Sequence, residues 1–219
     1  MVKNLPNRFS EQEIKGVYRA IETRRDIRHF IAKEIAPPIS TELLQRLIKA
    51  AHHAPSVGYM QPWHFIRITD SHLRHTIYEH VEQERLNTAD ALGERRDEFM
   101  KLKIEGIQQC SEVLIVSLTN QREKYILGRR TMPEMDLASV ACAIQNMWLA
   151  ARAEGIGLGW VSFFEPDVLA RLLNAPDGAL PVAILCIGHV EEFAEKPLLE
   201  TSGWDKRRNL SDIVSENTW

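Results

Sequence analysis

A continuous apolar pattern between Met135 and Ala153 restricts the fold of this chain more than any other feature. Its apolar residues recur every three or four positions, which is the spacing of one helical face. They are Leu137, Val140, Ala141, Ile144, Met147, Trp148 and Ala151. No other segment has so strong a helical pattern, and it predicts a helix at the centre of the fold.

The rest of the chain supplies the elements that would surround this helix. One helix follows the capping box at Ser10 and ends near Arg24, and another follows Ser40 and must stop before Pro55. Short apolar runs predict strands at 63–69, 112–119, 157–164 and 180–190. We find no internal repeat or linker. The sequence therefore predicts one α+β domain over residues 1–219, with helices around a mixed sheet.

Two segments have little core of their own. Residues 71–108 have a helical pattern with many charges and few apolar anchors, which predicts a solvated excursion with a lid at about 80–105. The tail, about 191–219, is mostly charged. We expect this tail to be an arm that lies across another surface, such as that of a second subunit.

The composition excludes several functional classes. The 219 residues have a net charge of −3, so no overall field favours nucleic acid or an anionic membrane. The apolar runs are too short to span a bilayer, and the N-terminus lacks the apolar core of a signal peptide. The three cysteines are odd in number and lack CxxC spacing. We therefore predict buried free thiols in a reducing cytoplasm, without a disulfide framework or a metal site.

A cluster of cations stands in ETRRDIRHF, residues 22–30, where Arg24, Arg25 and Arg28 surround Asp26. Cations at the end of a helix complement the helix dipole, so the cluster is consistent with an ordinary helix terminus. Planar guanidinium groups also make paired hydrogen bonds to phosphate or to an electron-rich carbonyl, which favours an anion-binding site. Asp26 should stay ionised among three arginines unless burial opposes this, and it would then orient or deprotonate a ligand group.

The second candidate is HAPSVGYMQPWHF, residues 53–65. Pro55 stops a helix and exposes the hydroxyl of Ser56 together with backbone N–H groups. Gly58 permits close approach of the backbone, and Gln61 offers both donors and acceptors. The stretch is consistent with a helix–strand connection that carries an aromatic plug, or with a platform for a planar heteroaromatic ligand.

The glycines of AEGIGLGW, residues 153–160, do not form a dinucleotide-binding motif. Such a motif follows a strand and opens a helix, whereas these glycines follow a helix and precede a strand. We expect them to end the central helix and turn the chain. Ser162, on the strand that follows, would present its hydroxyl at the edge of the sheet.

Taken in order along the chain, these motifs resemble the FMN-dependent nitroreductase family. RRDIRHF resembles its RRS-x-R-x-F opening, APSVGYMQPW its APS-x-x-N-x-QPW loop, AEGIGLGW its helix-to-strand turn, and DKRRNL its C-terminal arginine segment. The resemblance implies a three-layer α/β/α fold with a central mixed, mainly antiparallel sheet. It also implies an intertwined homodimer with two FMN sites at the subunit interface, each built from both chains.

Three departures narrow the resemblance. Asp26 replaces the family's usual serine, Met60 replaces its usual asparagine, and Ser162 follows the glycine turn. Together with MDLASVACAIQNMWLAARAEG, residues 135–155, they resemble a branch that fragments reduced FMN with O2 for the lower ligand of cobalamin. The products of that reaction are 5,6-dimethylbenzimidazole and erythrose 4-phosphate. The similarity is weak over 80–100, where the branch has its lid.

The resemblance also implies roles for individual residues. The arginines would hold the phosphate, ribityl and pyrimidine parts of the flavin, and the loop at 55–61 would line its ring. Asp26 and Ser162 would be catalytic, Asp26 as the general base at the ribityl C1′ and Ser162 near N5 of the flavin. The implied flavin-binding residues are Arg24, Arg25, Asp26, Arg28, Pro55, Ser56, Gly58, Gln61, Ser162 and Arg207.

Oxygen is the implied co-substrate and NAD(P)H is a candidate reductant. A separate flavin reductase is a candidate partner, whereas a metal, a nucleic acid or a membrane is not implied. Two alternatives stay open. One is an NAD(P)H-dependent nitroreductase or flavin reductase on the same fold, and the other is a flavin-binding protein without catalytic activity.

Overall fold

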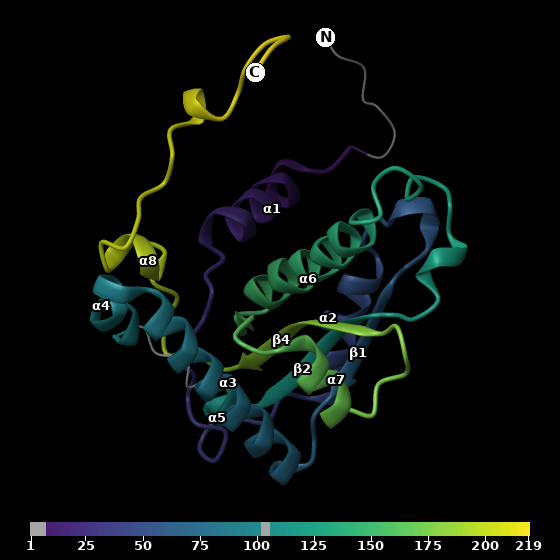
Figure 1. The fold of residues 1–219 in the computed structure, drawn as a ribbon. Helices are drawn as coiled ribbons and strands as arrows, with labels where there is room; N and C mark the ends of the chain where they lie inside the picture. The colour runs from purple at the N-terminus through teal and green to yellow at the C-terminus, as the bar shows by residue number, and fades with distance from the viewer. Residues whose placement is uncertain (1–7, 102–105) are drawn as a thin grey trace.

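The computed structural model describes residues 8–101 and 106–219 and has a four-stranded sheet at its centre (Figure 1). The spatial order is β1-β2-β4-β3, and every pairing is antiparallel. The strands are β1 (Trp63–Arg67), β2 (Glu112–Leu118), β3 (Gly157–Val161) and β4 (Leu180–Gly188). The four predicted strands are confirmed. β3 is shorter than predicted, because the N–H of Phe164 bonds to the carbonyl of Ser162 and turns the chain.

The sheet differs from the expected mixed sheet in one respect: its four described strands include no parallel pair. A parallel neighbour would have to be added at an edge. The outer edge of β1 pairs with no other strand within 8–101 and 106–219, so one edge of the sheet is open.

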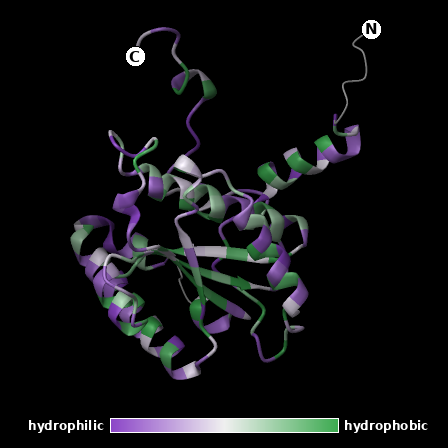
Figure 2. Ribbon diagram, turned by 90° about the vertical axis from the view of Figure 1, so that its right-hand side faces the viewer, coloured by the Kyte–Doolittle hydropathy of each residue, from purple (hydrophilic) through white to green (hydrophobic). Residues whose placement is uncertain are grey.

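Helices form a layer on each face of the sheet. On one face lie α2 (Thr41–His52) and α6 (Met135–Ala153), and on the other lie α3 (Ser71–Ala91), α5 (Gly106–Gln109) and α7 (Pro166–Leu172). Alternate residues of β2 enter the two cores, as the two-residue period of a strand requires. The strands in the middle of Figure 2 are accordingly mostly green, between the two helical layers. The predicted three-layer α/β/α fold is confirmed.

The central helix is α6, as the sequence predicts. Ile144 and Met147 are fully buried against the sheet. The opposite face of the helix is not covered: Leu137 is 46% exposed, Ala138 is exposed and Ala141 is half-buried. A central helix with small apolar residues on an uncovered face is a surface that another chain can pack against.

The three cysteines are free thiols. Cys110 and Cys186 are buried, as predicted. Cys142 is exposed, so the prediction is wrong for this residue. It lies four residues after Ala138 and therefore on the uncovered face of α6.

The segment predicted as a lid, about 80–105, is helical where the structure describes it. The second half of α3 continues into the 3-10 turn η2 (Gly93–Arg95) and the short helix α4 (Arg96–Met100). Residues 102–105 lie outside the described residues. Helix α4 lies beside α8 (Leu198–Thr201), the first part of the C-terminal arm (Figure 1).

The described N-terminal residues, from 8 onward, and the C-terminal arm extend from the body of the protein (Figure 1). Helix α1 (Glu11–Thr23) has the predicted capping box, in which the N–H of Glu13 donates to Ser10 Oγ at 3.3 Å, yet the helix buries none of its residues. Residues 205–219, which include the 3-10 turn η4 (Leu210–Asp212), are all exposed. The ends expose the apolar side chains Val17, Tyr18, Ile21, Leu210, Ile213 and Val214. No helix in the described part of the chain combines the length and the apolar content needed to cross a membrane.

Candidate active site

The cationic segment at 24–28 runs along the free edge of β3. Helix α1 ends at Thr23, and the N–H of Ile27 then donates to the carbonyl of Leu158 at 3.1 Å. A Cβ added at Gly159 would lie 2.1 Å from the carbonyl oxygen of Ile27. Any side chain at position 159 would therefore push this segment away from the strand. Gly155 has the predicted helix-ending role, with a φ of +74° just after α6.

Asp26 is held by two contacts at the end of β3. Its Oδ1 accepts a hydrogen bond from the N–H of Trp160 at 2.9 Å, and its Oδ2 lies 2.5 Å from Nη2 of Arg28. Burial raises the pKa of the Asp26 carboxyl, and this effect exceeds the opposing effect of Arg28 and the Trp160 N–H. The side chain is still 35% exposed, so a ligand can reach it. Asp26 is thus a partly buried carboxylate that takes up a proton more readily than an ordinary aspartate.

The arginines around Asp26 are fixed by different partners. The guanidinium of Arg24 lies 4.6 Å from the ring centroid of Trp148, and burial lowers its pKa, with a smaller contribution from nearby Arg207. Arg25 donates to the carbonyls of Glu22 at 2.8 Å and of Arg24 at 2.7 Å, and also to that of Glu195. The structure therefore brings Arg24, Arg25 and Arg28 together at Asp26, whereas Arg207 is exposed and does not line the cavities there.

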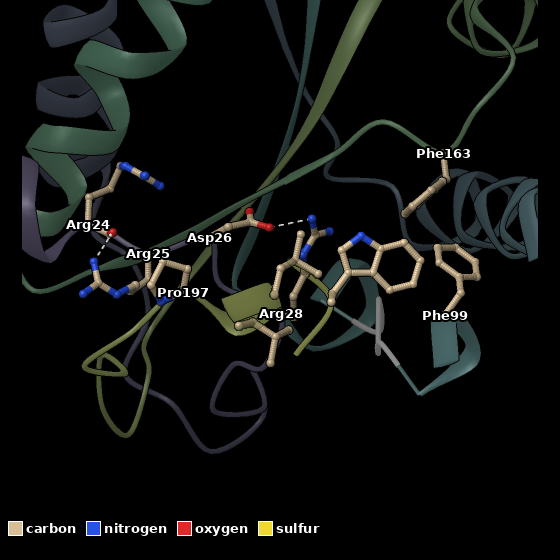
Figure 3. Close-up of a pocket in the computed structure, with 10 residues that line it drawn as sticks. Arg24, Arg25, Asp26, Arg28, Phe99, Phe163 and Pro197 are labelled. Carbon is tan, nitrogen blue, oxygen red and sulfur yellow. Dashed lines mark hydrogen bonds and ion pairs between the residues drawn. The ribbon is translucent and has the colours of Figure 1, made fainter. Parts of the chain in front are cut away.

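Asp26 lines three cavities, of which the third lies between residues 25–30 and 191–198. The first has a volume of about 310 Å³ (Figure 3). Its lining residues are Arg24, Arg25, Asp26, Arg28, Phe99, Phe163, Pro197, Leu198, Leu199 and Trp204. The second is a more open hollow at the outer face of α6. It is lined by Asp26, Leu137, Ala141, Trp148, Trp160, Ser162 and Val182. Asp26 and Ser162, the two predicted catalytic residues, thus share one hollow.

The loop at 55–61 is built as a rigid turn in a different place. The N–H of Val57 donates to Ser139 Oγ at 3.0 Å, and the N–H of Gln61 donates to Ser56 Oγ at 3.1 Å. Gly58 has a φ of +54°, and a Cβ there would lie 2.9 Å from the carbonyl oxygen of Leu127. Within this chain, Gly58 is needed for its backbone conformation and for its packing on Leu127.

The loop and the arginine cluster lie at opposite ends of α6. Val57 is anchored at Ser139, whereas Trp148 donates its indole N–H to the carbonyl of Arg25 at 3.0 Å. Ser139 and Trp148 are separated by about 14 Å along the helix, from a rise of about 1.5 Å per residue. None of the three cavities at Asp26 is lined by the predicted loop residues Pro55, Ser56, Gly58 or Gln61. One chain therefore does not bring the two halves of the predicted site together.

The aromatic residues of the site are not evident from the sequence. Three of the five tryptophans line the first two cavities, namely Trp148, Trp160 and Trp204. Phe99 and Phe163 join them in the first cavity. In a sequence, aromatic residues within apolar runs indicate a core and give no sign of a cavity. The one available signal is Trp204, one of three aromatic residues in the charged tail at 191–219.

Comparison with known proteins identifies the family to which this arrangement belongs. The nitroreductase family model matches residues 21–189, which is most of the chain. This chain belongs to the nitroreductase family. A solved structure of oxidized iodotyrosine deiodinase bound to FMN and 3-iodo-L-tyrosine superposes on this chain with a TM-score of 0.70. It is 22% identical and covers 93% of this chain and 100% of that one, so it confirms the fold.

Two curated relatives place this chain within the family. A protein of Rhodospirillum rubrum is 40% identical over 197 residues, which is 88% of this chain and 90% of the relative. A protein of Rhodobacter capsulatus is 36% identical over 200 residues, which is 90% of this chain and 95% of the relative. Both are named 5,6-dimethylbenzimidazole synthase. The branch that the sequence resembles is thereby confirmed.

Proposed function

We propose that this chain fragments reduced FMN with O2 to give 5,6-dimethylbenzimidazole and erythrose 4-phosphate, the former being the lower ligand of cobalamin. The observation that carries the proposal is the setting of Asp26, between Arg28 and the Trp160 N–H and in one hollow with Ser162. A carboxylate with a raised pKa is a suitable base for a weak carbon acid. The names of the two relatives support the same reaction.

The residues around Asp26 fit an anionic flavin. Nε of Arg25 and Nη1 of Arg28 are buried and have no hydrogen-bond partner in the described part of the chain, so two donors remain for ligand oxygens. An anion would also offset the repulsion between Arg24 and Arg207. In the hollow that Asp26 shares with Ser162, Trp148 and Trp160 offer aromatic surface for the flavin ring. Reduced flavin bound at this site would supply the electrons that react with oxygen.

In this proposal the chain's own residues position the flavin and move protons. The arginines hold the phosphate, ribityl and pyrimidine parts, and Asp26 takes a proton from the ribityl C1′. Arg28 keeps the carboxylate oriented and partly ionised, because it lies 2.5 Å away. The hydroxyl of Ser162 orients the flavin or exchanges a proton near N5. Electrons reach the site as reduced FMN, which NAD(P)H or a separate flavin reductase supplies.

The raised pKa of Asp26 predicts where product formation falls off at low pH. A general base works only when ionised, so the rate should fall as the pH drops through its pKa. Because burial raises this pKa, the inflection should lie above the ordinary value for aspartate, 3.8. Arg28 lowers the pKa, so Arg28→Gln should move the inflection to a still higher pH. Single-turnover rates with saturating reduced FMN measure this, and an inflection that does not move would contradict the role of Asp26.

We further propose that the functional unit is a homodimer. The loop at 55–61 is anchored about 14 Å along α6 from the arginine cluster, and its predicted flavin-binding residues do not line the cavities at Asp26 within one chain. Two copies packed through the uncovered faces of α6 in opposite directions would place the loop of each beside the arginines of the other. The apolar residues of α1 and of the arm, exposed in the single chain, would then find a surface to cover.

The experiment that tests the proposed reaction uses the full chain and photoreduced FMN. Mixing them in air and identifying the products by mass should give 5,6-dimethylbenzimidazole. Recovery of intact oxidised FMN with rapid NAD(P)H oxidation would instead identify an ordinary flavin reductase. Intact FMN without such turnover would identify a flavin-binding protein. Either of these results contradicts the proposal.

A further inference from the structure

The part of the predicted lid that the structure describes, residues 80–101, contacts the C-terminal arm at Trp204. The guanidinium of Arg95, in the turn before α4, lies 3.5 Å from the ring centroid of Trp204. Nη2 of Arg95 also donates to the carbonyl of Trp204 at 3.3 Å. Glu98 holds Arg95 in this position through a contact of 3.0 Å to its Nε. A stacked cation and a hydrogen bond therefore act on the same tryptophan.

Trp204 is the first of three neighbouring aromatic rings, and the last of them, Phe163, lies just after the end of β3. The ring of Trp204 lies 6.4 Å from that of Phe99, and Phe99 lies 5.6 Å from Phe163 in an edge-to-face arrangement. Phe99 is buried, with 5% exposure. Phe163 directly follows Ser162. Phe99 and Phe163 lie on one side of the first cavity, and Arg24 and Arg25 lie on the other (Figure 3). Trp204 lines the same cavity.

The arm segment that carries Trp204 is fixed at both ends. At its start, the carbonyl of Glu195 accepts a hydrogen bond from Arg25, which belongs to the arginine cluster. At its end, the carbonyl of Trp204 accepts a hydrogen bond from Nη2 of Arg95 at 3.3 Å. The N–H of Trp204 donates to the carbonyl of Leu199 at 3.0 Å, which folds the chain back after α8. The segment 195–204 therefore spans the cavity from the arginines to the lid.

From this arrangement we infer that Trp204 is a positioning residue that locks the lid to the C-terminal arm and keeps bulk water out of the cavity beside Asp26. The inference rests on the proposed function. Reduced FMN and O2 have two outcomes: fragmentation of the ring, or transfer of two electrons and two protons to O2, which gives hydrogen peroxide and oxidised FMN. Closure that excludes water suppresses the second outcome. Trp204 would thus set the ratio of product to peroxide.

The test compares Trp204→Ala with the wild-type full chain. Each is mixed with photoreduced FMN in air-saturated buffer, and 5,6-dimethylbenzimidazole and hydrogen peroxide are both measured per flavin consumed. The variant should give roughly tenfold less product per flavin, with a matching rise in peroxide, because the cavity opens to water. FMN affinity should change by no more than about threefold, since the arginines are untouched. Trp204→Phe, which keeps a ring beneath Arg95, should restore most of the product.

Trp219→Ala is the matched control, because Trp219 lies in the same arm and is fully exposed. It should keep the wild-type ratio. A wild-type ratio in Trp204→Ala, or an equal rise of peroxide in Trp219→Ala, would overturn the inference. Hydrogen exchange at α4 gives a readout that does not depend on the reaction: it should be faster in Trp204→Ala than in wild type. If the wild type makes no 5,6-dimethylbenzimidazole, the proposed function fails, and unchanged exchange at α4 would separately refute the lock.

Discussion

Asp26→Asn should bind FMN but form 5,6-dimethylbenzimidazole about 10²–10⁴-fold more slowly, the usual contribution of a general base. The amide oxygen of asparagine can still accept the hydrogen bond from the Trp160 N–H, so the segment along β3 should keep its place. The amide cannot take up a proton. Binding is measured by quenching of flavin fluorescence, and product is measured by chromatography after photoreduction in air.

The matched control for this variant is Asp167→Asn, which makes the same change at an exposed position in the first turn of α7. It should react at the wild-type rate. Undiminished product from Asp26→Asn would show that another group takes the proton. Loss of FMN binding together with activity would show that Asp26 is needed for the shape of the site, and the assignment of a base would lose its support.

Ala138→Arg should yield a monomer that binds FMN at least about 30-fold more weakly, which corresponds to about 2 kcal/mol. Ala138 is exposed on the face of α6 where we propose that two copies pack. An arginine there would be buried without a partner in the dimer, which is costly. It does not line the hollow at Asp26, so it does not obstruct the flavin directly. Size-exclusion chromatography with light scattering gives the oligomeric state, and fluorescence titration gives the affinity.

Gln83→Arg adds the same side chain at an exposed position of α3, on the other side of the sheet. It should remain a dimer with wild-type affinity. A monomeric Ala138→Arg that binds FMN as tightly as the wild type would show that one chain suffices for the site. The loop at 55–61 would then need a role other than lining the flavin of the partner subunit.

Much of this fold is predictable from the sequence because its signals are local. The period of the apolar residues identifies α6, and the capping box at Ser10 identifies the start of α1. The shorter β3 was missed, because Phe163 and Phe164 continue the apolar run although the chain turns after Val161. Their side chains serve the cavity wall and the second core, which a run of apolar letters does not reveal.

The site is predictable in its residues but not in its geometry. The motif around Asp26 indicates anion binding, yet the contacts from Trp148 and Trp160 that position it come from α6 and β3. The burial that raises the pKa of Asp26 also depends on tertiary packing. In the same way, nothing in the sequence links Arg95 to Trp204, which are separated by more than a hundred positions.

The close packing at Gly159 limits how this pocket can be redesigned. Asp26 is placed by a strand that leaves no room for even a methyl group beside Ile27. A library that varies the residues lining the cavities can change which ring fits without disturbing the backbone beneath them. A library that varies position 159 would displace the carboxylate of Asp26. Its members would therefore lose the proposed general base before they could accept a new substrate.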